Sequence, residues 1–261
     1  MSNSENVMES ERMIALYIDF ENIAEGAKEA KAKEFEIDLV LQRLLDKGKI
    51  LVKKAYADWS RFAEYKTKLH GAAVEMQDIP RRRISGKNSA DIKMVVDAMD
   101  LCYSKSHIDT FALVTGDSDF SPLVSKLREN NKYVIGIGAK GSSSDLLVSN
   151  CDEFVFYEDL LREREQAQKA KTRLPKGKKE AGAYEILIEA IKALYRENKE
   201  VLYSSLLKDT IKRKRPSFDE GFYGHSSFTK FLEDAARHDI IEIEKSPKSG
   251  TYVVTALGDK A

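Results

Sequence analysis

The first 160 residues alternate short apolar runs with longer segments in which apolar residues recur at helical spacing. Bounded runs such as residues 13–18 and 111–116 have the length and composition of buried strands. We predict six strands, at residues 13–19, 50–57, 73–78, 110–116, 132–138 and 153–157. Strands that alternate with amphipathic helices are typical of β-α units with parallel pairing. The pattern therefore predicts an α/β domain whose parallel sheet is covered by helices on both faces.

The segments between these runs predict the helices. Helical spacing is clearest in residues 36–47, and we also expect helices at 61–70, 90–103, 122–130 and 144–149. Ser121 is the expected N-cap of the helix at 122–130, because serine caps helices well and Pro122 suits the first helical position. Asn130 and Asn131 allow a left-handed exit from the same helix.

The pattern changes after residue 160. Residues 161–182 are rich in Lys, Arg and Glu and nearly devoid of large apolar side chains, which predicts a basic linker. Helical patterns follow at 184–196, 202–212 and 227–238, and alternating strands at 240–244 and 251–255 flank a turn at 246–250. Three helices and a β-hairpin predict a small winged-helix-like (α+β) domain over residues 183–257. Residues 1–12 are polar and acidic, and we expect them to be disordered.

Composition and charge narrow the functional classes. The 261 residues are 33% charged and 42% hydrophobic, as is ordinary for a globular protein. Residues 1–160 hold 22 Lys and Arg against 27 Asp and Glu, whereas residues 161–261 hold 21 against 16. A basic second half suits a nucleic-acid partner, whose phosphates attract Lys and Arg.

Neither a membrane nor an oxidising compartment is predicted. No apolar stretch approaches the roughly 18 residues of a membrane helix. Cys102 and Cys151 are isolated and lack a Cys or His at zinc-ligand spacing, so we expect buried, reduced thiols in a cytoplasmic protein. The four histidines have no partners recognisable in the sequence, and we predict no catalytic histidine.

Acidic residues stand where strands end. Asp19 and Asp117 directly follow predicted strands, Asp119 lies two residues beyond Asp117, and Asp91 opens a predicted helix. In open parallel sheets ligands bind beyond the carboxyl ends of the strands. Mg²⁺ and Mn²⁺ prefer such carboxylate ligands, and a bound ion there supports phosphodiester hydrolysis. Any one of these residues is equally well explained as a turn former or a helix N-cap, and Asp119 most of all.

Asp97 lies on the same predicted helix as Asp91 but at a different angle. Six residues at 3.6 per turn place the two about 120° apart. We expect the apolar stripe of this helix to consist of Ile92, Val95, Val96 and Met99. Asp97 lies opposite this stripe, so we expect it to be solvated or to support the site from outside.

Three ordered motifs resemble a known family. They are Tyr-Ile-Asp-Phe-Glu-Asn at residues 17–22, Lys-Asn-Ser-Ala-Asp-Ile at 87–92, and Val-Thr-Gly-Asp-Ser-Asp-Phe at 114–120. Together they resemble the NYN family of PIN-like ribonuclease domains over residues 13–160. The resemblance implies a PIN-like fold and RNA cleavage dependent on Mg²⁺ or Mn²⁺, with Asp19, Asp91 and Asp117 as the central metal-binding acids. It implies orienting or auxiliary catalytic roles for Asn22 and Asp119.

The second half resembles the OST-HTH or LOTUS domain. The similarity lies in residues 222–232, 240–243 and 250–254. This family is a small winged-helix fold associated with RNA binding or protein contact, and it occurs fused to NYN nucleases. Within the motif we expect Gly224 to permit a turn, and Phe228, Phe231 and Leu232 to be core residues.

Basic and aromatic side chains are candidates for RNA contact, because phosphate contacts position a strand without determining sequence specificity. The basic candidates are Arg81, Arg82, Arg83, Lys87, Lys212, Arg213, Lys214 and Arg215. A solvated loop and a solvated helix end are the alternatives for these two groups. Trp59, at the end of a predicted strand, either stacks on a base or packs in the core.

The preferred hypothesis is a metal-dependent ribonuclease with a C-terminal module that binds RNA or a protein partner. One alternative is a catalytically silent RNA-binding adaptor, in which the acids serve only the structure. The other is a phosphatase of the haloacid dehalogenase type. Such enzymes have a second Asp two residues after the nucleophile, where this chain has Glu21.

Overall fold

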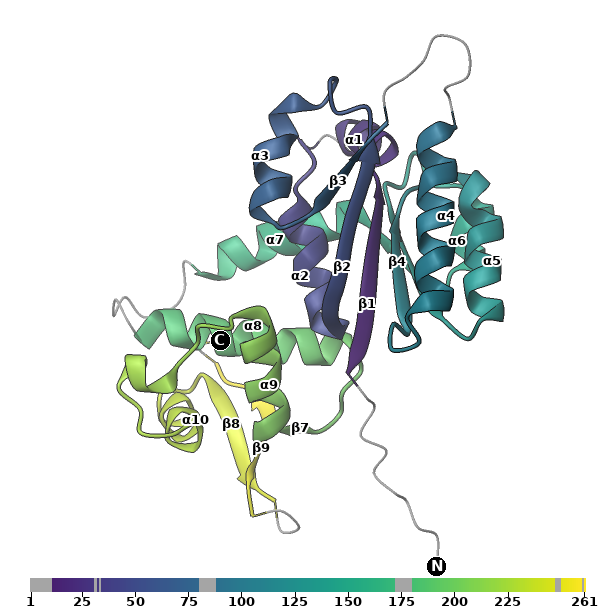
Figure 1. Ribbon diagram of the computed structural model, residues 1–261. Helices are drawn as coiled ribbons and strands as arrows, with labels where there is room; N and C mark the ends of the chain where they lie inside the picture. Colours follow the sequence, from purple (N-terminus) through teal and green to yellow (C-terminus); the bar gives the residue numbers. More distant parts are fainter. Residues whose placement is uncertain are drawn as a thin grey trace, which may run out of the picture. The chain divides into compact units, whose positions relative to one another are not determined.

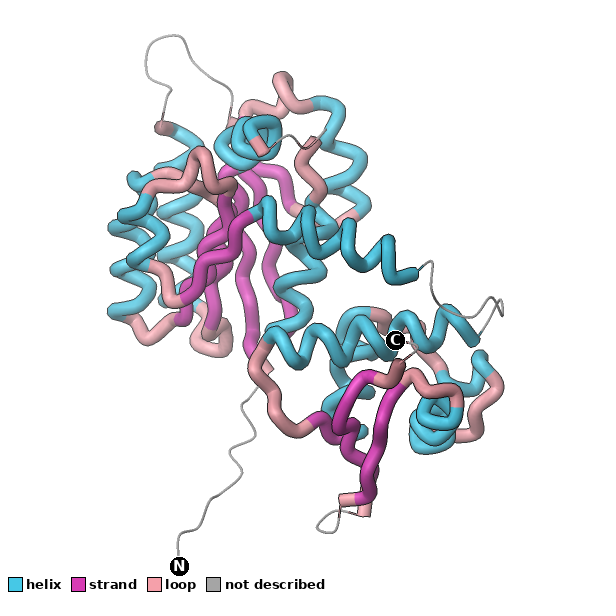
Figure 2. The backbone as a smooth tube through the Cα atoms, turned by 180° about the vertical axis from the view of Figure 1, so that it is seen from behind, coloured by secondary structure: helices cyan, strands magenta, loops and turns pink. Residues whose placement is uncertain are grey.

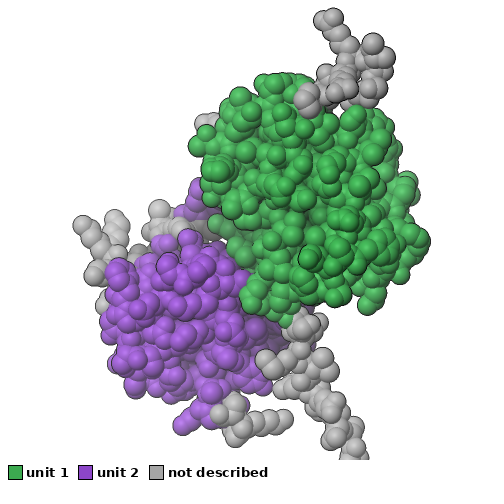
Figure 3. Space-filling model, viewed as in Figure 1, with its two compact units in different colours: residues 1–162 green, residues 163–261 purple. Residues whose placement is uncertain are grey.

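The computed structural model describes residues 11–30, 32, 34–79, 88–171, 180–246, 250–259 and 261 (Figure 1). The chain forms two compact units, Met1–Arg162 and Glu163–Ala261 (Figure 3). Each unit has a hydrophobic core of its own. The predicted disordered segment falls mostly outside the described residues, and Arg12 already begins the first strand.

The first unit is built on a six-stranded sheet in the order β3-β2-β1-β4-β5-β6, of which Figure 1 labels β1 to β4. Its strands are β1 (Arg12–Asp19), β2 (Gly48–Ala57), β3 (Glu75–Asp78), β4 (Thr110–Val114), β5 (Tyr133–Gly138) and β6 (Glu153–Phe156). Every neighbouring pair is parallel. β1 and β4 are adjacent and central, so their carboxyl ends lie side by side. The predicted α/β fold with a parallel sheet is confirmed.

Helices cover both faces of this sheet, as predicted. One face is covered by α1 (Phe20–Glu29), α2 (Ile37–Lys47), α3 (Ala63–Gly71) and α7 (Tyr157–Lys171), and the other by α4 (Ser89–Ser104), α5 (Ser121–Glu129) and α6 (Asp145–Asn150). β1 shows why two layers form, because its side chains alternate between the faces. Leu16 and Ile18 pack into the first core, and Ala15 and Tyr17 into the second.

Two helices, α1 and α7, were not predicted from the sequence. α1 begins directly after β1 and was not predicted, although Phe20, Ile23, Ala24 and Ala27 have helical spacing and are all buried. α7 continues through residues 161–171 of the predicted linker. Glu, Arg, Gln, Lys and Ala in this segment are good helix formers, so a sequence without an apolar stripe still forms a helix here. The rest of the predicted linker, up to residue 179, lies outside the described residues.

The start of α5 differs from the predicted cap. A 3₁₀ turn, η1 (Ser118–Phe120), leads directly into the helix, so Phe120 occupies the N-cap position and Ser121 is the first helical residue. The Ser121 hydroxyl makes no capping bond, and the expected serine cap is wrong. At the other end Asn131 has a φ of 57°, the predicted left-handed exit.

The second unit has a helical layer against a three-stranded antiparallel sheet in the order β7-β9-β8 (Figure 2). Its elements are α8 (Glu180–Arg196), β7 (Leu202–Tyr203), α9 (Ser204–Lys214), η2 (Glu220–Tyr223), α10 (Phe228–Arg237), β8 (Ile241–Lys245) and β9 (Tyr252–Leu257). Phe228, Phe231 and Leu232 are core residues, and Gly224 has a φ of 89°, as predicted. Among the helices described, none has the length and apolar character needed to cross a membrane.

Candidate active site

Asp19 is held at the junction between β1 and α1. It ends the strand and is the N-cap of the helix, with its Oδ1 accepting a hydrogen bond from the backbone N–H of Asn22 at 3.3 Å. The hydroxyl of Thr115 donates to Asp19 Oδ2 at 2.9 Å. Only 8% of Asp19 is exposed. Its capping role and its place in the site are therefore compatible, because one carboxylate performs both.

A short network joins the ends of β1 and β4. The Asn22 side-chain oxygen accepts the Gly116 N–H at 2.8 Å, and the Thr115 hydroxyl oxygen accepts the Asp117 N–H at 3.2 Å. The Thr115 hydroxyl thus contacts the Asp19 carboxylate and the Asp117 backbone, and it links the two residues. Thr115 was not among the predicted site residues, although it precedes the Gly-Asp pair of the third motif.

Gly116 is required by a close backbone approach. A Cβ on this residue would lie 2.3 Å from the carbonyl oxygen of Ser142, in the loop between β5 and α6. The same loop is hydrogen-bonded to Gly116, whose carbonyl accepts the N–H of Ser144 at 2.9 Å. Glycine here lets that loop pack against the turn carrying Asp117.

Asp117 and Asp119 have different local roles. Asp117 Oδ1 accepts the backbone N–H of Asp119 at 2.9 Å and so caps η1. Asp119 itself is exposed. The turn-forming role expected mainly of Asp119 therefore belongs to Asp117, and the Asp119 carboxylate projects into the site.

The acids raise the proton affinity of one another. Burial, followed by the charges of Asp91 and Asp117, raises the pKa of Asp19 to about 7. Burial and the charges of Asp117, Asp119 and Glu21 raise the pKa of Asp91. Asp91 lies in the first turn of α4, on a different element from the other acids. The fold thus brings Asp19, Asp91, Asp117 and Asp119 into one electrostatic cluster.

The cluster has suitable donors for a hard cation but no finished coordination shell. Within the described part of the chain, no three His, Cys, Asp or Glu side chains are placed to hold a metal ion together. Mg²⁺ binds proteins through one or two carboxylates and retains several waters, so it does not need three preset ligands. Carboxylates that raise one another's pKa would gain from a cation between them. The donor set therefore fits Mg²⁺ or Mn²⁺.

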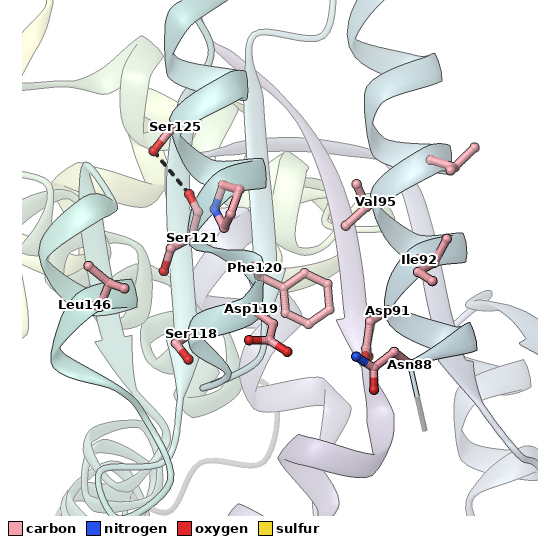
Figure 4. A pocket seen from close by; sticks show the side chains of 12 residues that line it. Asn88, Asp91, Ile92, Val95, Ser118, Asp119, Phe120, Ser121, Ser125 and Leu146 are labelled. Atoms are coloured by element: carbon pink, nitrogen blue, oxygen red, sulfur yellow. Dashed lines mark hydrogen bonds between the residues drawn. The ribbon is translucent and has the colours of Figure 1, made fainter. Parts of the chain in front are cut away.

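A groove of about 730 Å³ opens beside this cluster (Figure 4). Asp91 and Asp119 belong to its lining as well as to the cluster. It lies between α4, η1, α5 and α6, and its other lining residues are Asn88, Ile92, Val95, Val96, Ser118, Phe120, Ser121, Pro122, Ser125 and Leu146.

Comparison with known proteins agrees with this architecture. The family model of the NYN domain matches residues 13–160, which span the whole sheet and every acid of the cluster. The chain belongs to the NYN domain family. The model of the OST-HTH/LOTUS domain matches residues 184–253 of the second unit. Both predicted resemblances are confirmed, with a PIN-like nuclease fold for the NYN domain and an RNA-binding type of module for the OST-HTH/LOTUS domain.

The chain is similar to one uncharacterized protein and to one solved structure of unknown function. An uncharacterized protein of Methanocaldococcus jannaschii is 33% identical over 164 residues, which cover 62% of this chain and 62% of that protein. The match thus spans less than two thirds of the length of that relative. A crystal structure of a protein of unknown function from Vibrio parahaemolyticus is 26% identical, with a TM-score of 0.51, and covers 58% of this chain and 96% of that one.

The orientation of α4 in the NYN domain differs from the predicted one. The helix turns Met94, Ala98 and Cys102 towards the sheet, and the supposed inner residues Ile92 and Val96 are 63% and 56% exposed. The predicted stripe is therefore wrong in part, because apolar residues line more than one side of this helix.

The Asp97 side chain instead lies against the sheet and is 12% exposed. It accepts the Tyr56 hydroxyl at 2.8 Å and pairs with Lys93 at 2.5 Å. Although burial opposes the effect, these two hydrogen bonds lower the pKa of Asp97. The predicted solvated role is therefore wrong. Asp97 lies outside the acid cluster and anchors the helix that carries Asp91, which agrees with the other predicted role of supporting the site from outside.

Trp59 does not serve as a base-stacking platform in the NYN domain. The residue is 2% exposed, its ring packs 5.0 Å from that of Phe20, and its Nε1 donates to the Gln77 carbonyl at 2.9 Å. The core alternative is correct for this residue.

Glu21, which lies near the acid cluster, has an ion pair and a hydrogen bond. Its carboxylate pairs with Arg61 at 2.9 Å and accepts the Asp58 N–H at 3.4 Å. The side chain is 16% exposed. These bonds orient Glu21 towards the end of β2, and its charge still acts on Asp91.

The basic residues predicted to contact RNA differ in whether the structure describes them and in how exposed they are. Arg81, Arg82, Arg83 and Lys87 lie outside the described residues. In the OST-HTH/LOTUS domain Lys214 pairs with Glu189 at 3.0 Å and its side chain is only 7% exposed, while Lys212 donates to the Phe218 carbonyl. Arg215 is 53% exposed and lies 3.8 Å from Glu189. Lys212 and Lys214 thus also serve the fold of the domain, and RNA contact by all four residues of this group, Lys212, Arg213, Lys214 and Arg215, stays a prediction.

Proposed function

We propose that the protein is a metal-dependent ribonuclease that hydrolyses phosphodiester bonds at the acid cluster of its NYN domain. The observation that carries the proposal is the convergence of Asp19, Asp91, Asp117 and Asp119 at the carboxyl ends of β1 and β4. Carboxylates that repel one another lower the stability of a folded protein. A group of them at one edge of a sheet therefore indicates a functional site. An Mg²⁺ or Mn²⁺ ion bound there supplies Lewis-acid polarisation of a phosphoryl oxygen and a more acidic water.

The surrounding residues prepare the acids for this role. Thr115 and Asn22 hold Asp19 in one orientation, and the Asp117 backbone is fixed by the same Thr115 hydroxyl. Because the pKa of Asp19 is about 7, its carboxyl group is partly protonated near neutral pH when no cation is present. Binding of a cation displaces that proton, so affinity for the ion should increase as the pH rises towards 8.

A second candidate function is an RNA-binding adaptor without catalysis. The RNA-binding type of the second domain favours it. Membership of the NYN family and the pairing of Glu21 with Arg61 leave no support for the haloacid dehalogenase alternative.

The test compares RNA cleavage by the full chain and by Asp19→Asn and Asp117→Asn in Mg²⁺, Mn²⁺ and EDTA. Single-stranded and structured RNAs of defined length are the substrates. Losing several kcal/mol of charge stabilisation should lower the rate at least about a hundredfold in both variants. Asp100→Asn is the matched control, because Asp100 is an exposed carboxylate on α4. Equal cleavage by wild type and both variants would refute the proposal, and metal-independent RNA binding without cleavage would favour the adaptor.

A further inference from the structure

The groove beside the acid cluster has chemistry of its own. The side chains of Asp91, Asp119 and Asn88 gather at one end of it, and Phe120 lies between α5 and α4 (Figure 4). Apolar side chains form its walls, with Ile92 on α4 and Leu146 on α6. These two residues are 63% and 57% exposed, which is unusual for large aliphatic side chains beside a polar site.

Polar groups are placed among the apolar ones. Asn88 and Ser118 line the groove next to the carboxylates, and Ser125 donates its hydroxyl to the Ser121 carbonyl at 3.1 Å. An amide and hydroxyls between aliphatic walls are what a ligand with flat apolar faces and a polar edge requires. A purely apolar partner would leave these groups buried without hydrogen bonds.

Ser121 provides an independent observation. The residue lines the groove and is 5% exposed, and its hydroxyl has no hydrogen-bond partner among the described residues. Buried hydroxyl groups normally have a partner, and an exception needs an explanation. The 3₁₀ turn that precedes α5 denies Ser121 the capping bond that its type and position would otherwise supply. The hydroxyl oxygen itself is buried, so a ligand in the groove would supply the missing partner once the Ser121 side chain changes rotamer.

We propose that this groove binds the base and ribose of the nucleotide next to the phosphodiester held at Asp91 and Asp119. The assignment rests on the proposed ribonuclease function. A volume of about 730 Å³ lies in the range of small-ligand sites and accommodates one nucleoside. Because Asp91 and Asp119 line both the cluster and the groove, a phosphate at the acids places its own nucleoside against Ile92, Phe120 and Leu146. Ser118 and Asn88 then face the polar edges of that nucleoside, and Ser121 lies in the same lining.

The first measurement is the cost of removing one base. Cleavage of a short RNA in Mg²⁺ or Mn²⁺ is compared with cleavage of the same RNA carrying an abasic ribose at each position around the cut. One position adjoining the cut should lose roughly tenfold in rate, as expected for one stacked base. Abasic penalties absent at every position, with cleavage intact, would overturn the groove assignment and leave the ribonuclease proposal standing.

The second measurement asks whether the penalty belongs to the groove. Ile92→Ala and Leu146→Ala shorten exposed wall residues, and Leu51→Ala is the matched control because Leu51 is 48% exposed on β2 and does not line the groove. The abasic penalty should fall to about threefold or less in the wall variants and stay near tenfold in Leu51→Ala. The ratio of two substrates cancels any general loss of activity. An unchanged ratio in both wall variants would overturn the proposal.

Ser121→Ala tests the unpartnered hydroxyl. Its removal should leave the melting temperature unchanged or raised, because no bond of the fold is lost, and should reduce the abasic penalty about threefold. A lower melting temperature with an unchanged penalty would contradict a role in binding the nucleotide.

Failure of the ribonuclease proposal is distinguishable from failure of this one. If wild type cleaves no RNA, the Kd values of the intact and abasic oligonucleotides for the full chain are compared by fluorescence anisotropy. A base-dependent Kd that Leu146→Ala weakens and Leu51→Ala does not would support the groove as a nucleoside site without catalysis. Equal Kd values for all the variants would overturn it. A wild-type dimer that Leu146→Ala dissociates, with RNA binding unchanged, would assign the groove to a second copy instead.

Discussion

Asp19 shows how one buried carboxylate links stability to function. Its pKa rises from 3.8 to about 7 because burial and the neighbouring Asp91 and Asp117 disfavour its charge. Between these values the folded chain binds a proton that the unfolded chain has released. Stability of the metal-free protein therefore falls as the pH rises from about 4 through 7. The site is a local weakness of the fold that a bound cation would relieve.

Asp19→Asn should flatten this pH dependence. In EDTA, the unfolding free energy of wild type should fall between pH 5 and pH 8 by up to about 1.4 kcal/mol per pH unit, whereas the variant carries no charge to develop at this position. Urea denaturation at several pH values measures the two slopes. Mg²⁺ at pH 8 should restore stability to wild type more than to the variant. Identical slopes in the two proteins would show that Asp19 titrates normally.

Individual residues also show what sequence alone could establish about the site. The convergence of Asp19 and Asp117 was predictable, because strand ends in a parallel sheet meet at one edge whatever the details of packing. Asp91 reaches this edge from the first turn of α4. Trp59 was not, since a strand-end aromatic has the same sequence signature whether it packs inward or faces a ligand. The role of Thr115 depends on the register of β1 against β4, which no local pattern contains.

At the scale of elements, α4 shows where periodicity stops being informative. Val95 and Met99 are partly buried at the core, as expected, but Ile92 and Val96 face outward. The fully buried side is Met94, Ala98 and Cys102, two of which are small. Apolar residues lie on more than one side of this helix, so counting them identified only part of the buried side.

The position of α4 also depends on a polar anchor. Asp97 accepts the hydroxyl of Tyr56 on β2 and lies 3.7 Å from Lys54 of the same strand, and the Tyr17 hydroxyl of β1 donates to the Asp97 carbonyl at 3.1 Å. Tyr56 is 1% exposed, and burial and its bond to Asp97 raise its pKa. The anchor fixes the height of α4 over the sheet and thereby the place of Asp91.

Asp97→Ala should therefore lower both stability and cleavage. The Tyr56 hydroxyl would lose its acceptor, at a cost of about 1–3 kcal/mol in unfolding free energy. Cleavage should fall through kcat rather than KM, because displaced Asp91 affects the acids more than RNA binding. Asp97→Asn, which keeps an acceptor for Tyr56, should recover much of both losses.

Lys93→Ala is the control for the Asp97 prediction. Lys93 is 49% exposed and pairs with the same carboxylate, so its loss should cost less than about 1 kcal/mol and leave the rate of cleavage near that of wild type. Urea denaturation and steady-state cleavage measure the two effects. A Lys93→Ala variant as impaired as Asp97→Ala would show that the surface ion pair, and not the bond to Tyr56, holds the helix.

At the scale of the whole molecule, the chain has two domains with separate cores. The NYN domain has two core layers built only from its own residues, and the OST-HTH/LOTUS domain has a third. The acids lie in the half with excess negative charge, and residues 161–261 hold 21 Lys and Arg against 16 Asp and Glu. An acidic site repels RNA, so a second domain that holds the substrate would offset this repulsion.

Residues 11–171 alone should therefore fold and cleave short RNA at a rate near that of the full chain, since the core and the acid cluster are complete within them. Binding of RNA long enough to reach both domains should weaken at least about tenfold, because one tethered contact is lost. The slope of log Kd against log salt concentration should also become shallower, as fewer phosphates are neutralised. Fluorescence anisotropy on RNAs of increasing length measures both effects, and the cleavage assay on a short oligonucleotide is the internal control. Equal affinity and an equal salt slope for the two proteins on long RNA would assign the second domain to a protein partner rather than to RNA.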